Sequence, residues 1–90
     1  MTTDNAATIA VLEEVAAERR RQDELWGEQN HSPAEWITIL GEEYGEASRG
    51  AYEIWHDDAI GVNYREELIH TAAVCIAAAE SYDRNEGKEE

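Results

Sequence analysis

The chain has 90 residues and a formal net charge of −14, so it is long enough for one small domain and strongly acidic. Seven Lys and Arg residues against 21 Asp and Glu residues exclude nucleic acid and an anionic membrane as expected partners, because phosphate groups bind clustered cations. A single cysteine excludes an intrachain disulfide, and no apolar run approaches the ~18 residues of a membrane span, so we expect a cytoplasmic protein.

The first predicted helix runs from about Asn5 to Leu25 and ends at Trp26-Gly27. Apolar residues recur along it at the spacing of one helix face, which predicts a stripe that packs on a neighbouring helix: Ile9, Leu12, Val15 and Ala16. Charged side chains occupy its other faces, where Glu and Arg four residues apart add small support: Glu13, Glu14, Glu18, Arg19, Arg20 and Arg21.

The second predicted helix begins at Ser32-Pro33-Ala34-Glu35, which combines an N-cap Ser, a Pro at the first helical position and a Glu at the third. It continues to about Trp55, and its predicted apolar stripe consists of Trp36, Leu40, Tyr44, Ala47, Ala51 and Ile54. Glycines at positions 41, 45 and 50 interrupt this helix, and each costs about 1 kcal/mol relative to Ala. They indicate close approach of another helix or a ligand, with a locally weak helix as the alternative.

A loop is predicted over residues 56–62, followed by a third helix that begins after the N-cap Asn63 and runs to about Asp83. Its Ala-rich stripe is expected in the core, with Cys75 as a small buried thiol: Leu68, Ala72, Cys75, Ile76 and Ala79. Residues 85–90 are expected to form a frayed tail. Since no stretch alternates at period two, the sequence predicts a single all-α domain over residues 1–90 with three main helices.

Two pairs of side chains that can bind metal ions lie within apolar segments, Glu43-x-x-Glu46 in the second helix and Glu67-x-x-His70 in the third. The i, i+3 spacing puts both members of a pair on one side of a helix. Carboxylates on facing helices suit Mg²⁺ or Mn²⁺, whereas the softer imidazole suits Mn²⁺ or Zn²⁺ better than Mg²⁺. We therefore expect a metal site and, through it, a phosphate-handling function. The alternatives are solvated acids and a His70 that hydrogen-bonds within a helix interface.

These pairs resemble the motif of the MazG-like, all-α nucleoside triphosphate pyrophosphatase superfamily, in which Glu-x-x-Glu on one helix is followed by Glu-x-x-Asp on the next. Glu43, Glu46 and Glu67 match that motif. His70 stands where the family has Asp, and Glu66 stands where it often has Lys. The similarity covers roughly residues 10 to 84, and residues 18–31 look like the same segment of short MazG-like proteins common in phages and prophages.

The family resemblance implies a reaction and its metal ions. The reaction is cleavage between the α and β phosphates of a nucleotide, which gives a monophosphate and pyrophosphate. Glu43, Glu46 and Glu67 are the catalytic side chains that the motif implies, and with His70 they would hold Mg²⁺, with Mn²⁺ as the other possibility.

The resemblance also implies a place for the nucleotide. The order of Trp26, Gln29, His31 and Pro33 is similar to the base-contacting segment of dCTP pyrophosphatases, and Trp55 looks like a further match. Trp26 would stack on a base, while Gln29 and His31 would read its edge. Without the family, Trp26 is a hydrophobic plug at a helix end and His31 an exposed loop residue. Arginines that could hold phosphate oxygens, or simply be solvated, are Arg49, Arg65 and Arg84.

Assembly is the last implication of the family, whose chains pair so that helices from two subunits form a four-helix core beside the active sites. The short length favours a homo-oligomer, a dimer or a tetramer, independently of the family. Two other functions stay open. One is a non-catalytic protein that binds or sequesters a nucleotide or cyclic nucleotide, as some small helical phage proteins do; the other is a purely structural helical module.

Overall fold

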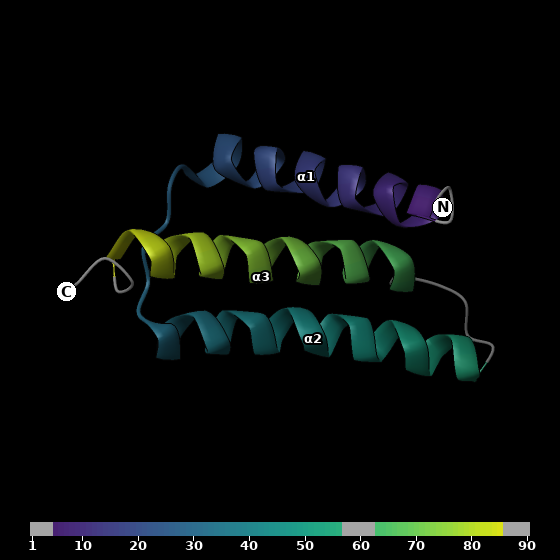
Figure 1. Cartoon of the computed structure of the whole chain (residues 1–90). Helices are drawn as coiled ribbons and strands as arrows, with labels where there is room; N and C mark the ends of the chain where they lie inside the picture. The colour runs from purple at the N-terminus through teal and green to yellow at the C-terminus, as the bar shows by residue number, and fades with distance from the viewer. Residues whose placement is uncertain (1–4, 57–62, 86–90) are drawn as a thin grey trace.

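The computed structural model describes residues 5–56 and 63–85, and within these ranges the chain forms three α-helices and no strand (Figure 1). Helix α1 spans Ala6–Trp26, α2 spans Pro33–Trp55 and α3 spans Tyr64–Asn85. The prediction of an all-α protein with three main helices is therefore confirmed for the described part of the chain. No helix in that part combines the length and the apolar character needed to cross a bilayer.

The ends of the helices lie within two residues of their predicted positions. Asn85 was assigned to the tail but is helical, because its side-chain amide donates to the Ser81 carbonyl oxygen at 3.0 Å and to the Asn30 side-chain oxygen at 2.7 Å. The rest of the predicted tail, residues 86–90, and most of the predicted loop, residues 57–62, lie outside the described residues.

The predicted start signals form as hydrogen-bonded caps. Ser32 Oγ accepts from the Glu35 backbone N–H at 3.2 Å, and a Glu35 carboxylate oxygen accepts from the Ser32 N–H at 2.9 Å, which completes a capping box. Asn63 Oδ1 accepts from the Glu66 N–H at 3.1 Å in the same way. Gly27, with φ of 72°, ends α1 in a backbone conformation that favours glycine.

Helix α3 lies between the other two helices (Figure 1). It packs against both α1 and α2, whereas within the described ranges no α-carbon of α1 lies within 8 Å of an α-carbon of α2. The buried apolar side chains are few and mostly small: Val15, Trp36, Ala47, Ala73, Val74 and Ala77. Trp36 is the one large member of this set and packs with Val74 and Ala77. The small residues allow α2 and α3 to approach closely.

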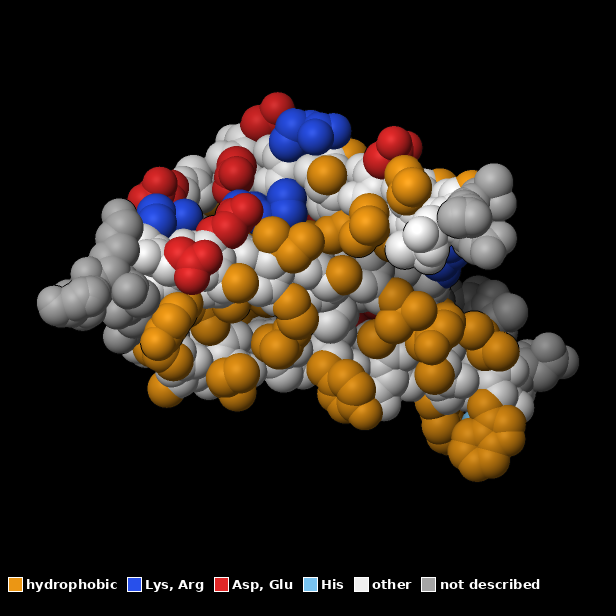
Figure 2. Space-filling model, in the orientation of Figure 1, with side chains coloured by type: hydrophobic (Ala, Val, Ile, Leu, Met, Phe, Trp, Pro, Cys, Tyr) orange, Lys and Arg blue, Asp and Glu red, His pale blue; other side chains and the backbone are white. Residues whose placement is uncertain are grey.

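The predicted apolar stripes are only partly buried, which corrects the sequence analysis. Val15, Trp36 and Ala47 are buried as expected, but Tyr44 is 68% exposed and Cys75 is also exposed. The remaining exposed members of the stripes are Ile9, Leu12, Ala16, Ala51, Ile54, Leu68, Ile76 and Ala79. The physical reason is the single layer of helices: each outer helix meets one neighbour only, and no helix covers the broad faces. Figure 2 accordingly shows apolar side chains spread over α2, α3 and the first half of α1.

The glycines of α2 do not mark a close approach at two of their three positions. A Cβ built on Gly41 or on Gly45 would meet no described atom within 4 Å, so the expectation of close contact is wrong there. Gly50, by contrast, is buried.

Polar contacts attach α1 and the segment that follows it to α3. Arg19 pairs with Glu80 at 2.7 Å, and Arg65 holds Glu14 with two hydrogen bonds of 2.8 Å. Arg84 donates to the Gln29 carbonyl oxygen at 3.0 Å, which fixes the connection between α1 and α2. The end of α1 and the connection after it are thereby placed beside α3.

Replacing Ser32 with Ala should lower the free energy of unfolding by about 1 kcal/mol, because the capping box is lost. Ser48→Ala is the matched control, since Ser48 is an exposed residue inside the same helix and Ala favours helix there. Urea denaturation followed by circular dichroism measures both variants. Equal stability of the two would contradict a stabilising role for this cap.

Candidate functional site

Three of the four predicted metal-binding side chains come together where α2 and α3 face each other. One ligand atom from each of Glu43, Glu67 and His70 lies within 4.8 Å of the other two, and all three residues are partly buried. Glu67 and His70 share a face of α3, and Glu67 Oε1 lies 3.4 Å from His70 Nδ1. Close packing of the two helices through small residues brings Glu43 across from them.

Glu46 lies apart from this group among the described residues and is exposed. The face of α2 that meets α3 runs through Glu43, Ala47 and Gly50, which are four and three residues apart. Glu46 therefore points to the side of this face. Its charge still acts on Glu43, so it belongs to the surroundings of the cluster.

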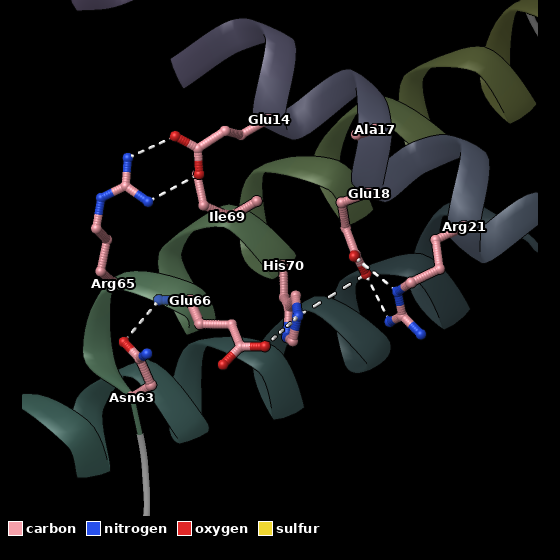
Figure 3. Close-up of a pocket in the computed structure, with 9 residues that line it drawn as sticks. All are labelled: Glu14, Ala17, Glu18, Arg21, Asn63, Arg65, Glu66, Ile69 and His70. Carbon is pink, nitrogen blue, oxygen red and sulfur yellow. Dashed lines mark hydrogen bonds and ion pairs between the residues drawn. The ribbon is translucent and has the colours of Figure 1, made fainter. Parts of the chain in front are cut away.

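Glu18 of α1 is a member of the site that sequence reasoning missed. It was expected on a solvent-facing side of its helix, but its side chain is only 10% exposed and its Oε2 lies 3.9 Å from His70 Nε2. Figure 3 shows Glu18 reaching from α1 toward the His70 ring of α3. The sequence contains one signal for this position, because Glu18 lies three residues after Val15 of the predicted apolar stripe; the structure adds that Gln22, on the same face, is buried.

The carboxyl groups of the site differ in their proton affinity. Burial raises the pKa of Glu43, and the nearby charge of Glu67 raises it further; Glu46 and Glu18 add to this, while His70 opposes it. Hydrogen bonds from Arg21 lower the pKa of Glu18 despite its burial. Negative charges gathered at one place are relieved by a cation. The donor set, two carboxylates and an imidazole, fits a divalent ion of the Mn²⁺ or Mg²⁺ type.

A cavity joins this cluster to part of the predicted nucleotide segment. It has a volume of about 230 Å³ and is lined by Trp26, Gln29, Trp36, Glu43 and His70 together with residues of all three helices. Trp36 is 5% exposed, and its indole N–H has no hydrogen-bond partner among the described residues. The cavity therefore offers charged oxygens and aromatic surface to one ligand.

The other three predicted substrate residues do not line this cavity: His31, Trp55 and Arg65. The centroids of the His31 and Trp36 rings lie 4.9 Å apart in an edge-on arrangement. His31 also borders a separate apolar groove with Ile37 and Tyr82. Trp55 is 80% exposed at the end of α2.

Arg65 lines a further pocket, between α1 and α3, that shares Glu18, Arg21 and His70 with the cavity. Its guanidinium is held by Glu14 there (Figure 3). A carboxylate already occupies the donors that the sequence analysis assigned to phosphate.

Comparisons of the chain with protein-family models, with curated proteins and with solved structures found no significant match.

The raised pKa of Glu43 predicts a pH-dependent stability in the absence of divalent ions. The folded state binds this proton more tightly than the unfolded state, so the free energy of unfolding falls as pH rises from the ordinary Glu pKa of about 4.3 through the raised value. Glu43→Gln should therefore stabilise the protein at pH 7, by about 0.5 kcal/mol if one like-charge contact is relieved, and have little effect at pH 4.

The measurement is chemical denaturation at both pH values in the presence of a chelator. Glu13→Gln is the control, because Glu13 is an exposed carboxylate of α1. A destabilised Glu43→Gln variant at pH 7 would contradict the repulsion inferred for the cluster.

Proposed function

We propose that this chain is a metal-dependent nucleotide pyrophosphohydrolase of the MazG-like kind, which cleaves a (d)NTP to a (d)NMP and pyrophosphate. One observation carries the proposal: a single cavity has Glu43 and His70 beside Trp26 and Gln29. A nucleotide needs both kinds of surface, a cation-binding end for its phosphates and an aromatic end for its base.

The acidic side chains would act through a cation. Glu43, Glu67 and His70 would hold Mg²⁺ or Mn²⁺, with Glu46 as an additional carboxylate beside them. A bound divalent ion would neutralise phosphate charge and lower the pKa of a water for attack on phosphorus. This requirement is strict here, because a chain of net charge −14 repels a free triphosphate.

The aromatic end of the cavity would position the base. The Trp26 ring offers a stacking surface, and the Gln29 amide can donate to and accept from a base edge. His31 supports this end indirectly, because its ring packs against the ring of Trp36. Trp55 and Arg65 do not line this cavity in the single chain, and Glu14 already holds Arg65, so their proposed contact with substrate requires a rearrangement or a second subunit.

The proposal includes a homo-oligomer, a dimer or a tetramer. Its support is the apolar surface of α2 and α3, where Ile37, Tyr44 and Ile76 are exposed (Figure 2). A surface of this kind on a small acidic domain marks an interaction site. Pairing of α2 and α3 with the same helices of a second copy would produce a four-helix core and bury that surface.

One rival function has specific support. His70 replaces the fourth acid of the family motif, and Glu46 lies outside the group of Glu43, Glu67 and His70. A cluster with fewer carboxylates binds Mg²⁺ less tightly, which favours a protein that holds a nucleotide or cyclic nucleotide without cleaving it.

The reaction is tested by product analysis. The protein, incubated with each common NTP and dNTP and with Mg²⁺ or Mn²⁺, should release a monophosphate and pyrophosphate that chromatography resolves. Glu43→Gln and Glu67→Gln should each lower the rate by more than about 100-fold, beyond the 10- to 100-fold typical of an outer ligand partner.

The matched control for the product analysis is Glu42→Gln, an exposed carboxylate next to Glu43 on α2 that should retain turnover. No products with either metal at high protein concentration would contradict the enzyme and favour the rival binder. Products that persist in Glu43→Gln would point to a contaminating activity.

The oligomer is tested by light scattering after size-exclusion chromatography. The unmodified chain of 10.1 kDa should elute with at least twice that mass, and Ile37→Glu should shift it toward the monomer, because a charge would be buried at the interface. Thr38→Glu introduces the same charge on the next, exposed residue and should leave the mass unchanged. A monomeric unmodified chain at all concentrations would contradict the assembly.

A further inference from the structure

The two nitrogens of His70 face different carboxylates. Nδ1 lies 3.4 Å from Glu67 Oε1, on the side of the metal-competent group. Nε2 lies 3.9 Å from Glu18 Oε2 and 3.8 Å from Glu66 Oε2 (Figure 3). A neutral imidazole binds a metal through its unprotonated nitrogen, so the partner of Nε2 decides which nitrogen is free.

Of the two carboxylates near Nε2, only Glu18 is held in place. Arg21 donates to both of its oxygens at 2.8 Å, and Gln22 donates to Oε2 at 3.2 Å. The Glu18 side chain is 10% exposed, whereas the Glu66 side chain is 59% exposed. A fixed, buried acceptor orients a ring at a lower entropic cost than a solvated one.

We propose that Glu18 is a positioning residue for a metal centre, an outer carboxylate that keeps the proton of His70 on Nε2 and so presents Nδ1 to a divalent ion held by Glu43 and Glu67. Ligating histidines commonly donate their other N–H to a carboxylate, which fixes both the tautomer and the ring orientation. The 3.9 Å separation exceeds a hydrogen bond, so the proposal requires that the His70 ring and the Glu18 carboxylate approach each other when a metal ion binds. The inference rests on the proposed metal-dependent function.

The arrangement also selects the class of metal ion. With Nδ1 as a ligand, the centre contains one imidazole and two carboxylates, a set that binds Mn²⁺ more tightly than Mg²⁺. Metal binding at α2 and α3 thereby becomes dependent on α1, which supplies Glu18 together with the Arg21 and Gln22 side chains that hold it.

The test is calorimetric titration with Mn²⁺ and, separately, with Mg²⁺, without any nucleotide. The unmodified chain should bind Mn²⁺ more tightly than Mg²⁺, and Glu18→Leu should weaken Mn²⁺ binding by about 10- to 100-fold. Glu13→Leu, the same change at an exposed position of α1, and Glu66→Leu, at the solvated competitor, should each change it by less than about threefold. Circular dichroism establishes that each variant is folded.

A double-mutant cycle with His70→Ala separates positioning from general stability. If Glu18 acts through His70, Glu18→Leu has no further effect on Mn²⁺ affinity once His70 is Ala. An unchanged affinity in Glu18→Leu, or an equal loss with and without His70, would overturn the inference and leave the proposed function standing. Absence of Mn²⁺ and Mg²⁺ binding by the unmodified chain would overturn the metal centre itself, and with it both proposals.

Discussion

The close packing of α2 on α3 is the interaction on which the rest of the structure depends. Trp36 packs with Val74 and Ala77 at this contact, and the partly buried Ile39 and Leu40 of α2 pack against the same cluster. The α3 side of the contact consists mostly of small residues, Ala73, Val74 and Ala77. Small residues let two helices approach until side chains at their margins meet, so Glu43 is brought within reach of Glu67 and His70. The same approach removes water from Glu43 and raises its pKa. The packing that holds the fold together therefore also creates the electrostatic strain that a cation would relieve.

Helix α1 is attached in a different way, and this difference shapes the site. Its buried residues are Val15 and Gln22, and its links to α3 are largely ion pairs such as Arg19 with Glu80. Exposed ion pairs contribute little stability each, about 0 to 1 kcal/mol, so α1 is the weaker of the two attachments to α3. Its buried face carries a carboxylate instead of a larger apolar side chain. A carboxylate on this buried face stabilises the packing less than an apolar side chain would, and it places Glu18 beside His70. This favours a functional reason for a Glu at position 18.

Sequence reasoning predicted the features that depend on neighbours in the chain. The caps at Ser32 and Asn63 form through hydrogen bonds between residues three apart in the chain. The local sequence is therefore enough to predict them. The burial of the apolar stripes depends on how many helices surround each face. The periodicity of a sequence does not predict how many helices pack there. Tyr44 and Cys75 are exposed for this reason. The meeting of Glu43 with Glu67 was expected from placing the two motifs on facing helices, whereas the i, i+3 spacing paired Glu43 with Glu46, which lies outside the cluster. The position of Glu18 depends on where a third helix packs.

These contacts indicate what a histidine at position 70 can do. The family motif has a carboxylate there, and this chain has an imidazole, so a motif read along the chain counts one acid fewer. A further carboxylate lies near position 70, because Glu18 reaches the His70 ring from α1, and hydrogen bonds from Arg21 lower the pKa of this Glu18 carboxyl group. The His70 imidazole lies between Glu18 and Glu67, with Nε2 3.9 Å from the first carboxylate and Nδ1 3.4 Å from the second. In the proposed metal centre, a histidine at this position would favour a metal ion that accepts nitrogen as well as oxygen ligands.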